Sequence, residues 1–413
     1  MKIAGIIAEY NPFHKGHAYQ IRCLREQGFD GIVAVMSGNF VQRASTALTD
    51  KYRRARGAVA SGVDLVLELP LPYAVASAED FAEGGVRVLS ETGMVSALCC
   101  GCESGDEKNR LQYEALCSAE KDGAVGAKMK EGLSYPAACR EAVREQGGVW
   151  SDAPNDVLAL AYRKALRRIA PDIPLIAIQR RGSYHEGSNL PLTAIRREGS
   201  NHEGADLPLT AIRREGSDHI GSDGFESAEA IRNRILLGQD VSLSLPLGSW
   251  GEQRGAPLSD LKRLERGILA YYRTATANEL KPYYGMREGL PERICRYADA
   301  RDLEALYDRV KTKRFPHSAV RRAVLCGYLK IPAALPKITY LRVLAFNETG
   351  QEILREMKKT CSLPVLPILT PRQGDDPLAR LQLRGDEIFA LTLPIPETGL
   401  RDLTESARKI CQN

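Results

Sequence analysis

The chain has 413 residues, of which 44 % are hydrophobic and 26 % charged, and its formal net charge is +5. These proportions are typical of a globular protein with two or three domains, and so small a charge does not by itself indicate a nucleic-acid partner. The apolar stretches fall short of the roughly 20 residues that span a bilayer, and the N-terminal apolar run ends at Glu9, too early for a signal peptide. We therefore expect a cytoplasmic protein without membrane contact.

Apolar runs alternate with helical patterns over the first 180 residues. Strand-like runs lie at 2–9, 31–38, 63–70, 96–101 and 173–180. Helical patterns lie at 16–27, 49–62, 78–91, 107–122, 124–146 and 155–169, with Thr49 as a plausible N-cap of the second. This alternation predicts an α/β fold with a doubly wound parallel sheet of the Rossmann type. The strands lack in–out alternation, as expected when helices cover both faces.

An internal duplication interrupts the pattern at 180–223. The segment 185–201 is followed by a near copy at 202–219, and the eleven residues LPLTAIRREGS recur unchanged 17 positions later. Two copies of so short a unit do not indicate a solenoid, and the Gly, Ser, Asn and Pro between the arginines favour a loop. We interpret 180–223 as a duplicated surface-loop insertion.

Helical patterns dominate after about residue 228. They lie at 227–238, 258–276, 302–314 and 317–329, and strand-like runs at 339–346 and 363–369 flank a helix at 350–360. We therefore divide the chain into an α/β domain at 1–240 and a mainly helical region at 241–413.

The turn after the first strand carries His14, Gly16 and His17 within NPFHKGH. In a doubly wound sheet this turn lies at the carboxyl edge, where ligands bind, and a helix N-terminus there favours phosphate. Glycine permits close approach of a phosphate, and imidazole N–H groups can stabilise the charge that builds as pyrophosphate leaves. A single histidine at a helix start is usually a cap or a surface residue, but two beside a glycine indicate a clamp for nucleotidyl transfer.

The ten cysteines indicate neither a disulfide framework nor a zinc site. Cys99 and Cys102 form one C-x-x-C pair without a second, and a structural zinc site needs four ligands. Small buried cysteines at the end of a strand are the simpler interpretation, so we expect no dedicated metal-binding cluster.

These motifs carry a resemblance at two levels. FHKGH resembles the H-x-G-H motif of the nucleotidyltransferase superfamily. Together with AVMSGNFVQR, GVDLVLELP, CGCESGD, APNDVLAL and KTKRF, it resembles the bacterial tRNA(Met) cytidine acetate ligase family over most of the chain. The resemblance implies that ATP and acetate form acetyl-adenylate, which acetylates N4 of the wobble cytidine of elongator tRNA(Met). We expect Mg²⁺ to accompany ATP, because metal ions commonly neutralise such phosphates.

The resemblance also implies an ATP site in which His14 and His17 are catalytic. Its residues are Ile7, Ala8, Glu9, Tyr10, Asn11, Pro12, Phe13, His14, Lys15, Gly16, His17, Ala18, Tyr19, Gln20, Gly101, Asn155, Arg180, Arg181, Ser227 and Arg232. Simpler interpretations remain open for some of them: Gly101 as a turn glycine, Asn155 as an N-cap, and the arginine pair as solvated charges.

Ser227 and Arg232 belong to an S-x-x-x-I-R signature that resembles a helix start in these nucleotidyltransferases, with the arginine reaching the β/γ-phosphates. Residues 193–196 and 210–213 in the duplicated segment mimic this signature. We assign the outermost copies, Arg180–Arg181 and Ser227–Arg232, because they alone adjoin a strand on one side and a helix on the other.

Five further residues near the turn receive no firm role. Ser37, Gly38 and Asn39 follow the second strand and are candidates for lining an acetate pocket. Lys51 and Arg54, near the start of the next helix, are candidates for steering phosphate or RNA.

From Arg309 to Lys330 the chain has seven Lys or Arg and no Asp or Glu, interleaved with Phe315 and His317. This mixture suits phosphate contacts and base stacking, although a solvated basic helix face is the alternative. With the family resemblance, tRNA binding is the better interpretation. The predicted RNA-binding residues are Lys311, Lys313, Arg314, Arg321 and Arg322.

Two other functions stay open from the sequence. A small-molecule adenylyltransferase of cofactor biosynthesis would share the H-x-G-H motif but would not need the basic residues at 311–322. A non-enzymatic RNA-binding protein with a bound nucleotide would not need His17.

Overall fold

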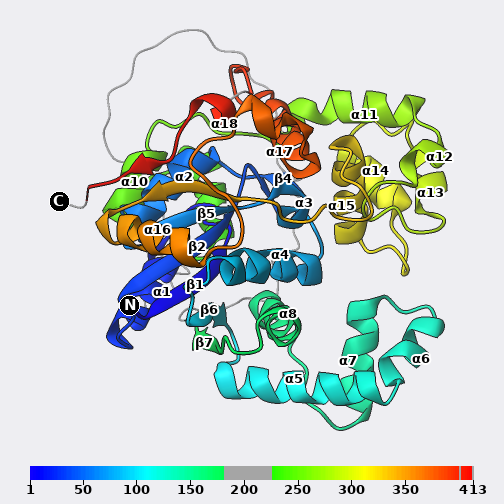
Figure 1. Ribbon diagram of the computed structural model, residues 1–413. Helices are drawn as coiled ribbons and strands as arrows, with labels where there is room; N and C mark the ends of the chain where they lie inside the picture. The colour runs from blue at the N-terminus through cyan, green and yellow to red at the C-terminus, as the bar shows by residue number, and fades with distance from the viewer. Residues whose placement is uncertain (181–225, 400, 412–413) are drawn as a thin grey trace, which may run out of the picture.

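A mixed, mainly parallel sheet forms the centre of the protein (Figure 1). The computed structural model describes residues 1–180, 226–399 and 401–411. The strands lie in the order β10-β8-β5-β2-β1-β6-β7, with β9 beside β8, and only the β5–β8 pair is antiparallel. Their bounds are β1 Ile3–Ala8, β2 Gly31–Ser37, β5 Leu65–Leu69, β6 Ala97–Cys102, β7 Leu175–Gln179, β8 Leu341–Phe346, β9 Val365–Leu366 and β10 Arg408–Lys409. A short hairpin, β3 (Phe40–Val41) with β4 (Ser45–Thr46), follows β2. The predicted doubly wound α/β fold is confirmed.

Alternate residues of the long strands, such as β1 and β2, pack into separate cores on the two faces of the sheet. Ile3 and Val33 lie in a core with α4 (Ala78–Glu91), α8 (Pro154–Ile169) and α16 (Glu348–Thr360). Ala4 and Ile32 lie in the other, with α1 (Lys15–Glu26) and α2 (Lys51–Val59). Because both faces are buried, β1 and β2 are almost entirely apolar, which explains their lack of in–out alternation.

Two expectations about the first 180 residues need correction. Asp50, not Thr49, caps α2, since its carboxylate accepts hydrogen bonds from two backbone N–H groups of that helix. The helix expected at 124–146 is two helices, α6 (Ala124–Lys130) and α7 (Tyr135–Glu145), and Gly132 between them has a φ of 93° that favours glycine. They share a small core with α5 (Asp106–Lys121).

Residues 261–331 form a compact unit, here called the helical body, with its own apolar core that includes Leu269, Leu306 and Val320. Its helices are η1 (Leu261–Leu264), α11 (Glu265–Thr274), α12 (Ala277–Leu280), α13 (Leu290–Arg296), α14 (Leu303–Val310) and α15 (His317–Tyr328). The sequence did not indicate α12 or α13, because elements of four to seven residues are too short to show a helical period.

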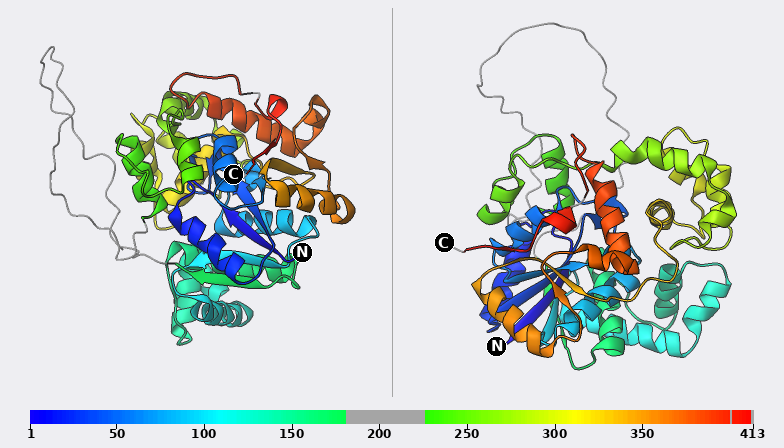
Figure 2. Two further views of the ribbon diagram at one scale, coloured as in Figure 1. Left: turned by 90° about the vertical axis from the view of Figure 1, so that its left-hand side faces the viewer. Right: turned by 45° about the horizontal axis from the view of Figure 1, so that its top comes forward.

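The remaining elements connect these parts. They are α3 (Leu71–Ala74), α9 (Ala228–Leu236), α10 (Leu247–Gln253), η2 (Pro371–Asp375), α17 (Pro377–Ala390) and α18 (Arg401–Thr404). The chain leaves the helical body and returns to the sheet through β8, β9 and β10 (Figures 1 and 2). The sheet therefore contains strands from both ranges that the sequence divided at residue 240. Within the described ranges, no helix combines the length and apolarity that crossing a membrane requires.

Candidate active site

The H-x-G-H turn forms the N-terminus of α1, directly after β1. His14 is the N-cap, and its Nδ1 accepts a hydrogen bond from the backbone N–H of Gly16 at 3.0 Å. In return, Nδ1 of His17 accepts from the backbone N–H of His14 at 3.2 Å. Each histidine thus takes the place of a capping-box residue and satisfies an N–H group that α1 would otherwise leave free.

This reciprocal capping determines the protonation of both rings. The two imidazoles stack with centroids 3.9 Å apart. Burial, with the positive charges of Arg180 and Arg232, lowers the pKa of His14 to about 3. Burial and the neighbouring His14 likewise lower the pKa of His17 well below its usual range. A neutral imidazole whose Nδ1 accepts must carry its proton on Nε2, so the turn presents two Nε2–H donors near neutral pH.

Gly16 is required by His14 itself. A Cβ at this position would lie 2.8 Å from Cε1 and 3.0 Å from Nδ1 of the His14 ring. The sequence indicated that this glycine makes room for a phosphate; the structure shows that the His14 imidazole occupies the place of the missing side chain.

Two arginines from distant segments approach the histidine pair. Ser227 caps α9 as predicted, because its hydroxyl accepts from the backbone N–H of Ala230. Arg232 on the same helix donates to the backbone carbonyl of Asn11 at 2.8 Å, and burial lowers its pKa. Arg180 follows β7, and its side chain passes over Gly101, where a Cβ would lie 3.3 Å from its Cγ. Gly101 is therefore a position of close approach rather than a plain turn.

Other predicted ATP-site residues have different surroundings. Asn155 does not cap α8: the N-cap is Ala153, and the Asn155 amide donates to the carboxylate of Glu103. Ile7, Tyr10 and Phe13 are buried in the two cores that flank the sheet, so they can offer a ligand little beyond their backbone. Arg181 and the repeat copies at 193–196 and 210–213 lie outside the described residues.

Arg54 is a buried structural residue, contrary to the idea that it steers phosphate or RNA. Its guanidinium donates to the carbonyls of Glu9 (2.6 Å), Ser37 (3.1 Å), Gly38 and Thr49 (3.1 Å). It thereby joins the carboxyl ends of β1 and β2 to the start of α2. Burial lowers its pKa to about 10, so it remains charged at neutral pH. The sequence offered no signal for this role, because nothing in it distinguishes Arg54 from Arg53 and Arg56 on the same helix.

Lys51 is likewise buried and does not face a ligand. Its ammonium contacts Glu68 (2.8 Å), Asp386 (2.8 Å) and Asp402 (2.6 Å), which come from β5, α17 and α18. Burial alone would lower its pKa, but the three carboxylates together raise it well above the usual value. This cluster fastens the C-terminal segment to the sheet.

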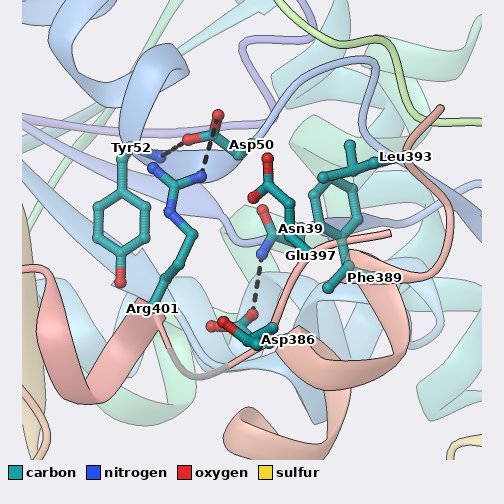
Figure 3. Close-up of a pocket in the computed structure, with 11 residues that line it drawn as sticks. Asn39, Asp50, Tyr52, Asp386, Phe389, Leu393, Glu397 and Arg401 are labelled. Carbon is teal, nitrogen blue, oxygen red and sulfur yellow. Dashed lines mark hydrogen bonds and ion pairs between the residues drawn. The ribbon is translucent and has the colours of Figure 1, made fainter. Parts of the chain in front are cut away.

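A small cavity beside this cluster does not suit acetate. Its lining includes Asn39, Asp50, Asp386, Glu397 and Arg401 (Figure 3). Arg401 is the only cationic residue in this lining, and its guanidinium pairs with the carboxylate of Asp50 at 3.3 Å. The Asn39 amide donates to the carboxylate of Asp386 at 2.9 Å. Three carboxylates around the space disfavour a further anion. Asn39 is therefore a structural link rather than an acetate ligand.

The predicted RNA-binding residues fall into two groups. Lys311, Lys313 and Arg314 are exposed in the turn between α14 and α15. Arg321 and Arg322 are half-buried, and Arg322 donates to the carbonyl of Val75, which attaches the helical body to the sheet domain. The aromatic side chain expected to stack on bases, Phe315, is only 5 % exposed and belongs to the core of the helical body. That part of the prediction is wrong.

Comparisons with known proteins agree with this geometry. The sequence profile of the HIGH Nucleotidyl Transferase family matches residues 1–206 and 198–400. A doubly wound sheet with an H-x-G-H helix start at its carboxyl edge thus defines this chain as a nucleotidyltransferase of the HIGH class.

The relatives narrow the class further. The tRNA(Met) cytidine acetate ligase of Acetivibrio thermocellus is 32 % identical over 95 % of this chain and 94 % of its own. The enzyme of the same name from Ligilactobacillus salivarius is 34 % identical over 91 % of this chain and 92 % of its own. The crystal structure of Thermotoga maritima TmcAL bound with alpha-thio ATP superposes with a TM-score of 0.80 at 27 % identity, over the full length of both chains. The chain belongs to the tRNA(Met) cytidine acetate ligase family and is a ligase.

Proposed function

We propose that the protein joins acetate to tRNA(Met) at the expense of ATP, in two steps at one site. An acetate oxygen attacks the α-phosphorus of ATP, the new P–O bond forms, and pyrophosphate leaves with the electrons of the broken bond. N4 of the wobble cytidine then attacks the acetyl carbonyl, N4 loses a proton, and AMP departs. The acceptor and the acyl group are inferred from the names of the relatives. Because the proposed substrate is a tRNA, we also propose a cytoplasmic location.

The observation that carries the proposal is the pair of neutral imidazoles at the start of α1. The Nε2–H groups of His14 and His17 would donate to phosphate oxygens as charge builds on the leaving pyrophosphate. Because the rings are already fixed by backbone N–H groups, little reorganisation is needed when ATP binds. Arg232 and Arg180 would add positive charge near the same phosphates.

Mg²⁺ would enter with ATP. The residues that the structure describes contain no group of three or more His, Cys, Asp or Glu side chains that could hold a metal. Mg²⁺ bound with nucleotides usually keeps several waters and takes phosphate oxygens as ligands. We therefore assign the protein the placement of the triphosphate and leave charge neutralisation by Mg²⁺ to the nucleotide.

Acetate-dependent exchange of labelled pyrophosphate into ATP tests the first step, and transfer of labelled acetate to tRNA tests the second. A His17→Asn variant should lose both, with a fall of about 10²–10³-fold in rate. The matched control is His317→Asn, which changes a histidine on the helical body and should leave the rate of pyrophosphate exchange unchanged.

Two outcomes would replace the proposal. ATP turnover that ignores acetate and uses a small phosphorylated acceptor would indicate an adenylyltransferase of cofactor biosynthesis. RNA binding without any ATP cleavage would indicate a non-enzymatic binding protein.

A further inference from the structure

The positive charge of the chain is concentrated in the helical body. Residues 261–331 contain 16 Lys or Arg and 8 Asp or Glu, a net charge of +8, whereas the whole chain has +5. The rest of the chain is therefore net negative. A surface with this asymmetry attracts a polyanion to one part of the molecule.

A shallow hollow in the helical body gathers several of these charges. It is lined by Arg273, Cys295, Arg296, Ala298 and Asp299, between α11 and the end of α13. The guanidinium of Arg273 donates to the carbonyls of Ala298 (3.1 Å) and Ala300 (3.0 Å). It is thus held in place by the main chain rather than by a carboxylate.

Next to the hollow, two arginines make cation–π contacts with one tyrosine. The guanidinium carbons of Arg293 and Arg309 lie 5.5 Å and 4.9 Å from the ring centroid of Tyr297. Arg293 donates to the carbonyls of Val310 (3.0 Å) and Arg309 (3.1 Å), which again fixes its position through the backbone. Arg309 contacts Asp299 at 2.9 Å, with side chains 42 % and 73 % exposed.

We propose that this arginine hollow, formed by Arg273, Arg293, Arg296 and Arg309 around Tyr297, binds the phosphodiester backbone of the RNA substrate. The inference rests on the proposed function and names a contact surface separate from the turn at 311–314. Guanidinium groups match phosphate oxygens in geometry, and arginines held by the main chain lose little freedom on binding. An exposed ion pair contributes little in water, so a phosphate can replace Asp299 beside Arg309.

The position of the hollow explains why RNA, and not the nucleotide, is its partner. In Figure 1 the helical body lies to the right of the sheet and α1 to its left, and the right-hand view of Figure 2 keeps this arrangement. The hollow shares no lining residue with the histidine turn, so a nucleotide bound at the start of α1 leaves it free. A tRNA is long enough to contact both places.

The test measures tRNA binding at several salt concentrations for three variants of the full chain. Arg296→Gln should weaken binding about fivefold near 0.15 M salt and reduce the salt slope by about one, because one phosphate contact is lost. Asp299→Asn should instead tighten binding, since it frees Arg309. Arg110→Gln, which removes an exposed charge on α5, is the control and should change neither quantity.

Pyrophosphate exchange on the same samples separates this inference from the proposed function. Exchange should be unaltered in all three variants, which also shows that they are folded. Equal effects of Arg296→Gln and Arg110→Gln, or no tightening in Asp299→Asn, would overturn the RNA surface even if exchange is normal. Absent exchange in the unaltered protein would reject the ligase proposal while the binding result still stands. Preferential binding of an acidic polypeptide over tRNA would also overturn the inference.

Discussion

Replacing His14 with asparagine separates the two roles that the structure gives this residue. As the N-cap of α1, His14 accepts the N–H of Gly16 through Nδ1. Asparagine is a preferred N-cap, and its Oδ1 can accept the same N–H, so the helix start is preserved. Asparagine does not titrate, however, and it has no donor at the position of Nε2.

The expected pH effect follows from the pKa of His14. In the folded protein, burial and the positive charges of Arg180 and Arg232 lower it from 6.5 to about 3. Below pH 6.5 the unfolded chain takes up a proton that the folded protein does not, so stability is full above pH 6.5 and is lost as the pH falls towards 3. Each pH unit below 6.5 lowers the free energy of unfolding by about 1.4 kcal/mol, which amounts to about 2 kcal/mol at pH 5.

Urea unfolding at pH 7 and pH 5 measures this contribution. The unaltered protein should lose about 2 kcal/mol more than His14→Asn between the two pH values. Titrating groups away from the turn affect both proteins equally and cancel in the comparison. Burial keeps the pKa of His17 low in both proteins, although the variant lacks the part of that lowering that His14 causes. At pH 7 the variant should be folded but about 10²–10³-fold slower in pyrophosphate exchange. Equal losses of stability in both proteins would show that His14 is not held neutral, and normal exchange would remove it from catalysis.

Three further substitutions test the surroundings of the turn. Gly16→Ala should slow exchange up to about 10²-fold by displacing the His14 ring, while changing stability by less than about 1 kcal/mol; unchanged exchange would contradict this reason for the glycine. Lys51→Met should destabilise the protein by about 3–5 kcal/mol in urea unfolding, and adding Asp402→Asn should recover part of the loss; no recovery would argue against the charge cluster. Arg54→Lys keeps the positive charge but loses the several N–H donors of the guanidinium, so it should lower the free energy of unfolding by about 3 kcal/mol and slow pyrophosphate exchange. A normal unfolding curve would mean that other contacts hold the ends of β1 and β2.

The parts of the site that were predictable are those encoded over a few residues. The H-x-G-H turn and the Ser227 cap have local signatures, and the structure places both as expected at helix starts. The error at Phe315 and the different setting of Asn155 have the opposite origin. A short motif does not show whether an aromatic ring faces solvent, nor which partner an amide finds.

The sequence by itself determined that the first 180 residues form a parallel α/β sheet and that the histidine turn follows its first strand, because strand and helix periods, caps and apolar runs act between near neighbours. Only the tertiary structure decided that β8 pairs antiparallel with β5 and that Lys51 meets Asp386 and Asp402. Asp386 and Asp402 lie 335 and 351 residues from Lys51 along the chain. Their meeting depends on the path of the backbone through the helical body and back, and on the need to neutralise charges once they are buried.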